Sequence, residues 1–122
     1  MSQTVPPQLK QSRRAKQETE PHTSVETDEL LSLFGDEYTR AVLEAVAETP
    51  LPGADIVDKT GFSKATVYRR LDRLESAGLV KSETMFDPDG HHRERFQITF
   101  ERATCRFGPE GLEMTVHTNS SE

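Results

Sequence analysis

Residues 54–78 read ADIVDKTGFSKATVYRRLDRLESAG, and this stretch predicts two helices that meet at a tight corner. Residues 54–60 form the shorter helix, and Gly61 follows where a left-handed residue ends a helix at low cost. Ser63 stands at the N-cap of the second helix, where its hydroxyl can accept a hydrogen bond from the backbone N–H of residue 65 or 66. The second helix is therefore expected to begin directly after Ser63.

This second helix has an apolar face and a basic face. Val67, Leu71 and Leu74 are spaced by four and three residues, so they lie on one side and point inward. The outward side carries Ala65, Thr66, Tyr68, Arg69, Asp72 and Arg73, with Lys64 and Arg70 on its flanks. A helix buried on one side, with Arg, Lys, Thr and Tyr on the other, suits the major groove of DNA.

The same pattern also fits a helical corner with a solvated charged face, which is the commonest fate of such a face. Residues 59–73 contain five basic residues and one acid, Asp72, in a chain whose net charge is −6. This crowding of positive charge, together with the corner glycine and the capping serine, favours DNA binding over an inert corner.

The run SKATVYRRLDRLESAGLVKSE, residues 63–83, resembles the recognition helix and first wing strand of winged helix-turn-helix transcription regulators. The matching residues are Thr66-Val67, the pair Leu71 and Leu74, and the AGLV at 77–80. The run is most similar to archaeal regulators described as resembling the ArsR or TrmB groups. The resemblance covers about residues 28–100 and implies an α+β fold, with three core helices and a β-hairpin wing.

Length and composition limit the chain to one small domain. It has 122 residues, of which 33% are hydrophobic, and it has no Trp. A single Cys excludes an internal disulfide and fits a reducing cytoplasm. No stretch approaches the ~20 apolar residues that span a bilayer, and no apolar signal region precedes the rest. We expect a cytoplasmic protein without a membrane partner.

The acidic balance of the chain has to be reconciled with DNA binding. Residues 28–122 contain 11 Lys and Arg against 18 Asp and Glu, a net charge of −7. A local basic surface can still attract phosphate within a screening length of ~8 to 10 Å, because nearby charges dominate the field there. An acidic surface is also usual in proteins of salt-loving archaea, in agreement with the resemblance.

Residues 1–27 are expected to form a disordered tail, because they are polar, contain three prolines and show no apolar period. The tail carries a basic cluster formed by Lys10, Arg13, Arg14 and Lys16. This cluster either follows phosphates beside the main site or belongs to a solubilising tail without a further role.

A helical period begins at Asp28, and Asp36 can cap a further helix from residue 37 to about 48. Residues 49–53, TPLPG, end that helix. In the resembled family the first helix often supports a homodimer. That resemblance makes Leu30, Leu31 and Phe34 candidate dimer contacts, with ordinary core packing as the alternative.

Two hairpins are predicted after the second corner helix. Residues 79–86 and 93–100 read as strands around the turn at 87–90, and the resemblance makes this hairpin the wing. Candidate wing contacts to the DNA backbone or minor groove are His91, His92, Arg93 and Arg95. Residues 101–122 are expected to add a second hairpin, with strands at 104–107 and 112–116 and Leu112, Met114 and Val116 facing inward. That hairpin could lengthen the wing sheet or pair across a twofold axis.

The sequence gives little support for a metal site or a catalytic site. His91, His92, Cys105 and His117 are able to bind zinc, but the paired Cys spacing of a strong zinc motif is absent. Phosphate-binding loops and nucleophile elbows are also missing. We predict no metal, no cofactor, no identifiable small-molecule ligand and no enzymatic activity.

Together these patterns predict a sequence-specific transcription regulator that binds double-stranded DNA as a homodimer. Arg69 is the first candidate for a base contact, since a guanidinium matches O6 and N7 of guanine. The remaining candidate DNA contacts of the helix are Ser63 at its start, Thr66 and Tyr68 on bases or phosphate, and Lys64, Arg70 and Arg73 mainly on phosphate. The alternative is a winged-helix module that binds proteins in a transcription or replication assembly without reading DNA sequence.

Overall fold

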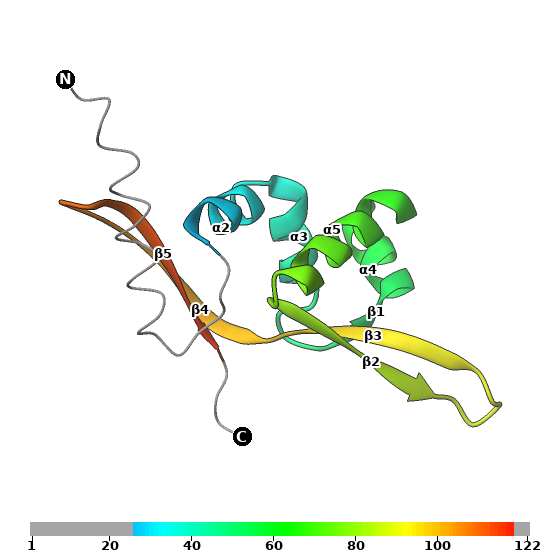
Figure 1. Ribbon diagram of the computed structural model, residues 1–122. Helices are drawn as coiled ribbons and strands as arrows, with labels where there is room; N and C mark the ends of the chain where they lie inside the picture. Colours follow the sequence, from blue (N-terminus) through cyan, green and yellow to red (C-terminus); the bar gives the residue numbers. More distant parts are fainter. Residues whose placement is uncertain (1–25, 119–122) are drawn as a thin grey trace. The chain divides into compact units, whose positions relative to one another are not determined.

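The computed structural model describes residues 26–118, which form an α+β architecture of four helices and two small antiparallel sheets (Figure 1). The helices are α2 (Thr27–Phe34), α3 (Glu37–Ala45), α4 (Gly53–Thr60) and α5 (Lys64–Ser76). The strands are β1 (Leu51–Pro52), β2 (Val80–Phe86), β3 (His92–Ile98), β4 (Phe100–Gly108) and β5 (Gly111–Thr118). The described chain divides into two compact units, residues 32–99 and residues 26–31 with 100–118.

Local capping chemistry sets the corner between α4 and α5 as the sequence predicted. Gly61 ends α4 in the left-handed region at φ 79°, and its N–H donates to the carbonyl of Val57 at 2.8 Å. Ser63 caps α5, because its hydroxyl accepts from the backbone N–H of Thr66 at 3.1 Å. The corner places the start of α5 at the surface.

The core of residues 32–99 lies between the helices and the beginning of β2. Val67, Leu71 and Leu74 of α5 are at most 1% exposed, which confirms the predicted inward face. The other side chains of this unit that are less than 3% exposed include Leu33, Val42, Val46, Ile56, Leu79 and Val80. Burial of apolar area on this scale holds α5 against α3 and α4.

Strand β1 was not predicted. Helix α3 ends at Ala45, about three residues before the end near 48 that was predicted from residues 49–53, and Leu51 pairs with Phe96 and Pro52 with Arg95 to give a three-stranded sheet in the order β1-β3-β2. Pro52 lacks an N–H, and it is tolerated because β1 is an edge strand. The segment between α3 and α4 is therefore tied to β3, which fixes the start of α4 beside the hairpin.

The hairpin β2–β3 runs in register from Val80 opposite Ile98 to Phe86 opposite His92 (Figure 1). Gly90 takes φ 90° in the connecting turn, where the predicted turn lies. The returning strand ends at Ile98, two residues earlier than predicted. Thr99 interrupts it by donating its N–H to the carbonyl of Leu79 and its hydroxyl to the carbonyl of Gly78.

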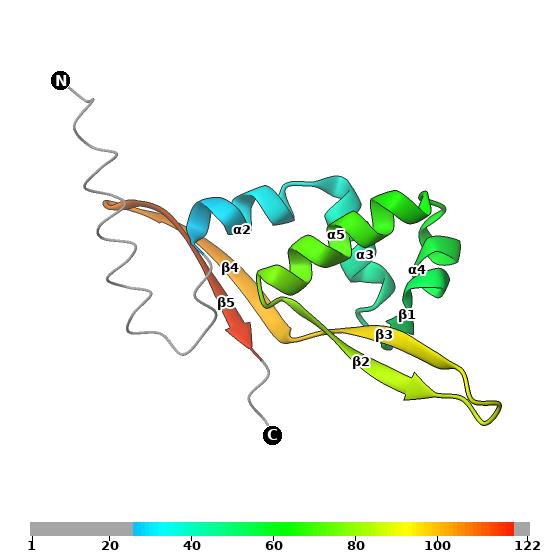
Figure 2. The ribbon, with the colours of Figure 1, turned by 45° about the vertical axis from the view of Figure 1, so that its right-hand side comes forward.

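The second unit joins the hairpin β4–β5 to the first turn of α2 (Figure 2). The hydroxyl of Thr27 accepts a hydrogen bond from the backbone N–H of Met114 at 3.3 Å, and Thr27 is 2% exposed. Thr27 therefore belongs to the folded part, although the expected tail included it. Both strands of this hairpin are longer than predicted, since pairing extends from Phe100 opposite Thr118 to the turn at Gly108.

The basic cluster of Lys10, Arg13, Arg14 and Lys16 lies outside the described residues. Within residues 26–118, none of the helices combines the length and apolar character needed to cross a bilayer.

Candidate nucleic-acid interface

The exposed face of α5 begins at its N-terminus. Lys64, Ala65 and Arg69 are exposed, and neither Lys64 nor Arg69 forms a hydrogen bond or ion pair with the part of the chain that the structure describes. The hydroxyl of Ser63 donates to that of Thr66 at 3.0 Å, so these two predicted contacts are arranged around the helix start. Two unneutralised cations therefore stand on the first two turns of the helix.

Arg70 is engaged within the fold. Its Nε lies 2.9 Å from Oδ2 of Asp36, its guanidinium stacks 5.3 Å from the ring centre of Tyr38, and its side chain is 19% exposed. The hydrogen bond from Arg70 holds the pKa of the Asp36 carboxyl well below its usual range, and hydrogen bonds from Thr39 act in the same direction against partial burial. The pair ties the middle of α5 to the N-cap of α3.

Arg73 is also directed toward a neighbouring helix. Its guanidinium donates to the hydroxyl of Ser32 at 3.2 Å, and the side chain is half-buried. The three arginines of α5 thus separate into one open to solvent, Arg69, and two that contact α2 or the loop before α3. The sequence had predicted Arg70 and Arg73, together with Lys64, as phosphate contacts.

Tyr68 fills the space between α5, the start of α4 and β3. Its ring meets that of Phe96 edge-on, with 6.4 Å between centroids. A Cβ added to Gly53 would overlap the Tyr68 hydroxyl, so the ring rests directly on the first residue of α4. A shallow hollow beside the ring is lined by Pro52, Gly53, Ala54, Tyr68, Arg93, Glu94 and Phe96.

This contact yields a stability prediction. Gly53→Ala is expected to lower the free energy of unfolding by about 1 to 2 kcal/mol, because the methyl group must displace the Tyr68 ring from Phe96. Urea denaturation followed by circular dichroism measures the change. The double variant Gly53→Ala with Tyr68→Leu, which removes the obstructing hydroxyl, should recover part of the loss. A stability of Gly53→Ala equal to or above that of the wild type would contradict the packing described here.

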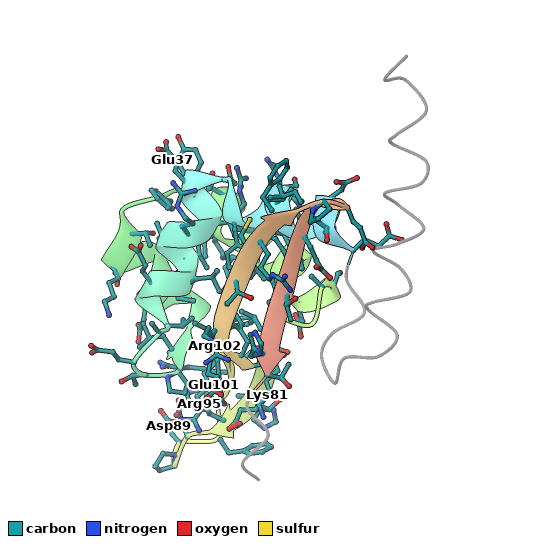
Figure 3. The ribbon with its side chains drawn as sticks, turned by 90° about the vertical axis from the view of Figure 1, so that its left-hand side faces the viewer. Glu37, Lys81, Asp89, Arg95, Glu101 and Arg102 are labelled. Carbon is teal, nitrogen blue, oxygen red and sulfur yellow. The ribbon has the colours of Figure 1, made fainter. Side chains whose placement is uncertain are left out.

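The basic residues of the hairpin β2–β3 differ in their surroundings. Arg95 is paired with Glu83 at 2.9 Å, and Figure 3 labels Arg95 on this hairpin. Arg93 is exposed and has no ion-pair partner among residues 26–118. His91 lies beside Asp89 in the turn, with 3.3 Å between Nδ1 and Oδ2. Arg93 and Lys81 are therefore open cations of this hairpin, as Lys64 and Arg69 are of α5.

Phe86 is an exposed aromatic residue that the sequence analysis did not single out. It is 71% exposed, and its ring meets that of His92 edge-on at 4.6 Å between centroids, next to the turn. Phe86 lies directly before the turn at 87–90. Alternation along β2 puts it on the same face as Val80 but farther from the core, so its exposure could have been predicted from the sequence.

The other candidates are distributed as follows. Leu30 is 1% exposed in its own chain, which favours the core-packing alternative for it, whereas Leu31 and Phe34 are half-buried.

Cys105 lies opposite Met114 and His117 lies opposite Arg102 in the hairpin β4–β5, so these two possible zinc ligands stand on opposite faces of it.

Comparison with known families identifies the part of the chain that holds this face. Residues 39–84 match the model described as the IclR helix-turn-helix domain. The match begins in α3 and ends in β2, and thus includes the whole of α4 and α5. No curated protein matches the chain. The match supports a DNA-binding helix-turn-helix transcription regulator and points away from an enzyme.

Proposed function

We propose that the chain is a sequence-specific transcription regulator that binds double-stranded DNA as a winged helix. In this proposal α5 enters the major groove and the hairpin β2–β3 acts as the wing along the backbone or minor groove. The observation that carries the proposal is the exposed, unneutralised pair Lys64 and Arg69 on the first two turns of α5. The IclR helix-turn-helix match over the same helix supports it.

The contacts of the arginines suggest separate roles. Arg69 reads a base edge, because a free guanidinium can bond O6 and N7 of a guanine at once. Lys64 neutralises a phosphate, and the hydroxyls of Ser63 and Thr66 lie close enough to the helix start to contact the backbone. Arg70 and Arg73 instead hold α5 in place through Asp36 and Ser32. Tyr68 supports the helix from its inner flank.

In the wing, Arg93 is the proposed phosphate contact, with His91 and Arg95 contributing less because each lies beside a carboxylate. Phe86 and His92 form an exposed aromatic pair next to the turn. Apolar side chains that enter the minor groove can open a base step partially. We assign this role to Phe86.

A wing variant tests that assignment. Phe86→Ala is expected to lower affinity for the cognate duplex by about 5-fold, which corresponds to about 1 kcal/mol. Phe86→Leu keeps an apolar wedge and should retain most of the affinity. Fluorescence anisotropy with a labelled duplex measures both. Equal losses for the two variants, or no loss for either, would remove Phe86 from the interface.

Two further parts of the proposal concern assembly and type. A twofold operator, with half-sites about one helical turn or a multiple apart, requires a homodimer. The AGLV at 77–80 and the acidic composition support an archaeal regulator of the ArsR-like or TrmB-like type.

The net charge of −6 favours the other use of a winged fold, as a protein-interaction module. A gel shift with the duplex upstream of the chain's own gene separates the two, with excess competitor DNA at ~200 mM salt. A band that persists supports the regulator, because non-specific binding falls steeply with salt. Smearing that disappears on salt addition contradicts it.

A further inference from the structure

Over residues 103–107 and 112–116, the hairpin β4–β5 has one face without any charged side chain. Residues that lie opposite each other in an antiparallel pair share a face, and the register places Ala103, Cys105 and Phe107 opposite Val116, Met114 and Leu112. These six residues are called the apolar face. The other face carries Arg102, Thr104, Arg106, Glu113, Thr115 and His117. Figure 3 labels Arg102 near the start of β4.

The apolar face is covered at one end and open at the other. Val116 and Met114 are 0% and 7% exposed, and the Met114 backbone bonds to the hydroxyl of Thr27 in the same unit. Toward the turn, Phe107 is 82% exposed, Cys105 is exposed and Leu112 is half-buried. The open end of the apolar face, formed by Cys105, Phe107 and Leu112, therefore leaves a large aromatic ring in water.

An apolar strand face that alternates along residues 103–107 and 112–116 is normally buried against another layer. A two-stranded hairpin also gains little stability alone and needs a further layer on its apolar side. Thr27, the first residue of α2, bonds to the backbone of Met114 and so lies at the buried end of this face, which holds Met114 and Val116. The pattern thus indicates that something else covers Phe107.

We propose that a second copy of this chain covers it, with the open end of one apolar face packed against the same end of its partner across a twofold axis. The inference rests on the proposed function, because a twofold operator needs two copies. It places the homodimer contact in the terminal hairpin, whereas the sequence resemblance had suggested Leu30, Leu31 and Phe34.

The charge distribution favours a second copy of the chain as the partner that covers the open end of the apolar face. Residues 28–122 have a net charge of −7, so two copies repel each other wherever their acidic surfaces meet. A face that bears no charge avoids this repulsion, and a twofold contact requires that one patch be complementary to itself. The apolar face meets both conditions, because its charged neighbours Arg102, Arg106 and Glu113 point to the opposite side.

The main test is sedimentation velocity of the full chain from ~1 to 100 μM. The wild type is expected to sediment as a dimer, and Phe107→Glu as a monomer to at least tenfold higher concentration. Thr104→Glu, which places the same charge on the opposite face of β4, should remain dimeric. Because Phe107 is 82% exposed in one chain, Phe107→Glu removes little intrachain packing, and its circular dichroism should match the wild type. A monomeric wild type, or a dimer that survives Phe107→Glu, overturns the proposal.

Cys105 supplies a second readout, since it is the single cysteine of the chain and lies in the open end of the apolar face. A short bis-maleimide reagent should link two copies through Cys105 in the wild type and in Thr104→Glu, but not in Phe107→Glu. Equal linking in all three proteins contradicts the twofold contact.

Failure of this inference can be distinguished from failure of the proposed function. Phe107→Glu should still bind a single half-site with the wild-type sequence preference, because α5 is unchanged. A wild type that binds its operator specifically as a monomer overturns the dimer contact alone. A dimer that depends on Phe107 and has no sequence preference supports the contact and overturns the proposed regulator.

Discussion

Asp36→Ala is expected to lower the free energy of unfolding by about 2 to 3 kcal/mol. The substitution removes the N-cap of α3, worth about 1 kcal/mol, and leaves the partly buried Arg70 guanidinium without its acceptor. For a domain of this size the melting temperature should fall by roughly 10 °C or more. Urea denaturation at pH 7 measures the effect.

Two control variants divide this loss between its causes. Asp36→Asn keeps a good capping side chain, so it should lose only the part due to the Arg70 ion pair. Glu37→Ala removes an exposed acid at the start of α3, labelled in Figure 3, and should cost less than about 1 kcal/mol. If all three variants unfolded with the wild-type midpoint, Asp36 would have no anchoring role.

The pH dependence of the stability difference between the wild type and Asp36→Ala follows from the lowered pKa of Asp36. A carboxyl whose folded pKa lies below its unfolded value contributes stability that is fully present above the unfolded pKa, near 3.9. This contribution is lost as pH falls from about 4 toward the folded pKa. The stability gap between wild type and Asp36→Ala should therefore be constant from pH 5 to 8 and narrow below pH 4.

Arg69→Ala is expected to weaken binding to the cognate duplex by about 1 to 3 kcal/mol, roughly 5- to 150-fold, and to weaken binding to random DNA far less. The side chain is exposed and has no partner in the described part of the chain, so fold stability should be unchanged. The expected loss reflects a base contact that random sequences rarely offer.

Lys64→Ala is the matched control for Arg69→Ala. It should reduce affinity similarly for cognate and random duplexes and lower the slope of log K against log salt by about 1. Anisotropy titrations at several salt concentrations measure both variants. If Arg69→Ala behaved as Lys64→Ala is expected to, Arg69 would be a backbone contact.

Local patterns in the sequence predicted the helical part well. Ser63 and Gly61 fix the ends of α5 and α4 through their own backbone and hydroxyl chemistry, and Val67, Leu71 and Leu74 follow the helical period into the core. Each of these features depends on residues within a few positions of one another. A single sequence is therefore sufficient to predict them.

The features that sequence reasoning missed depend on distant partners. Strand β1 is extended because Leu51 pairs with Phe96, 45 positions later in the chain. Helical geometry placed Arg70 on the flank of the basic face, but its bond to Asp36, 34 residues earlier, required the packing of α3 against α5. Tyr68 was predicted on the outward face of α5, because its neighbours Gly53 and Phe96 are distant in the sequence and only the structure shows them beside it.

In the proposed function, the exposed start of α5 reads DNA sequence. Its most direct test is selection of bound duplexes from a random double-stranded pool by the wild-type chain, followed by affinity measurement on the enriched sequences. We expect one shared motif, bound at least ~10³-fold more tightly than unselected DNA. A pool without an enriched motif, with every duplex bound equally, would contradict it.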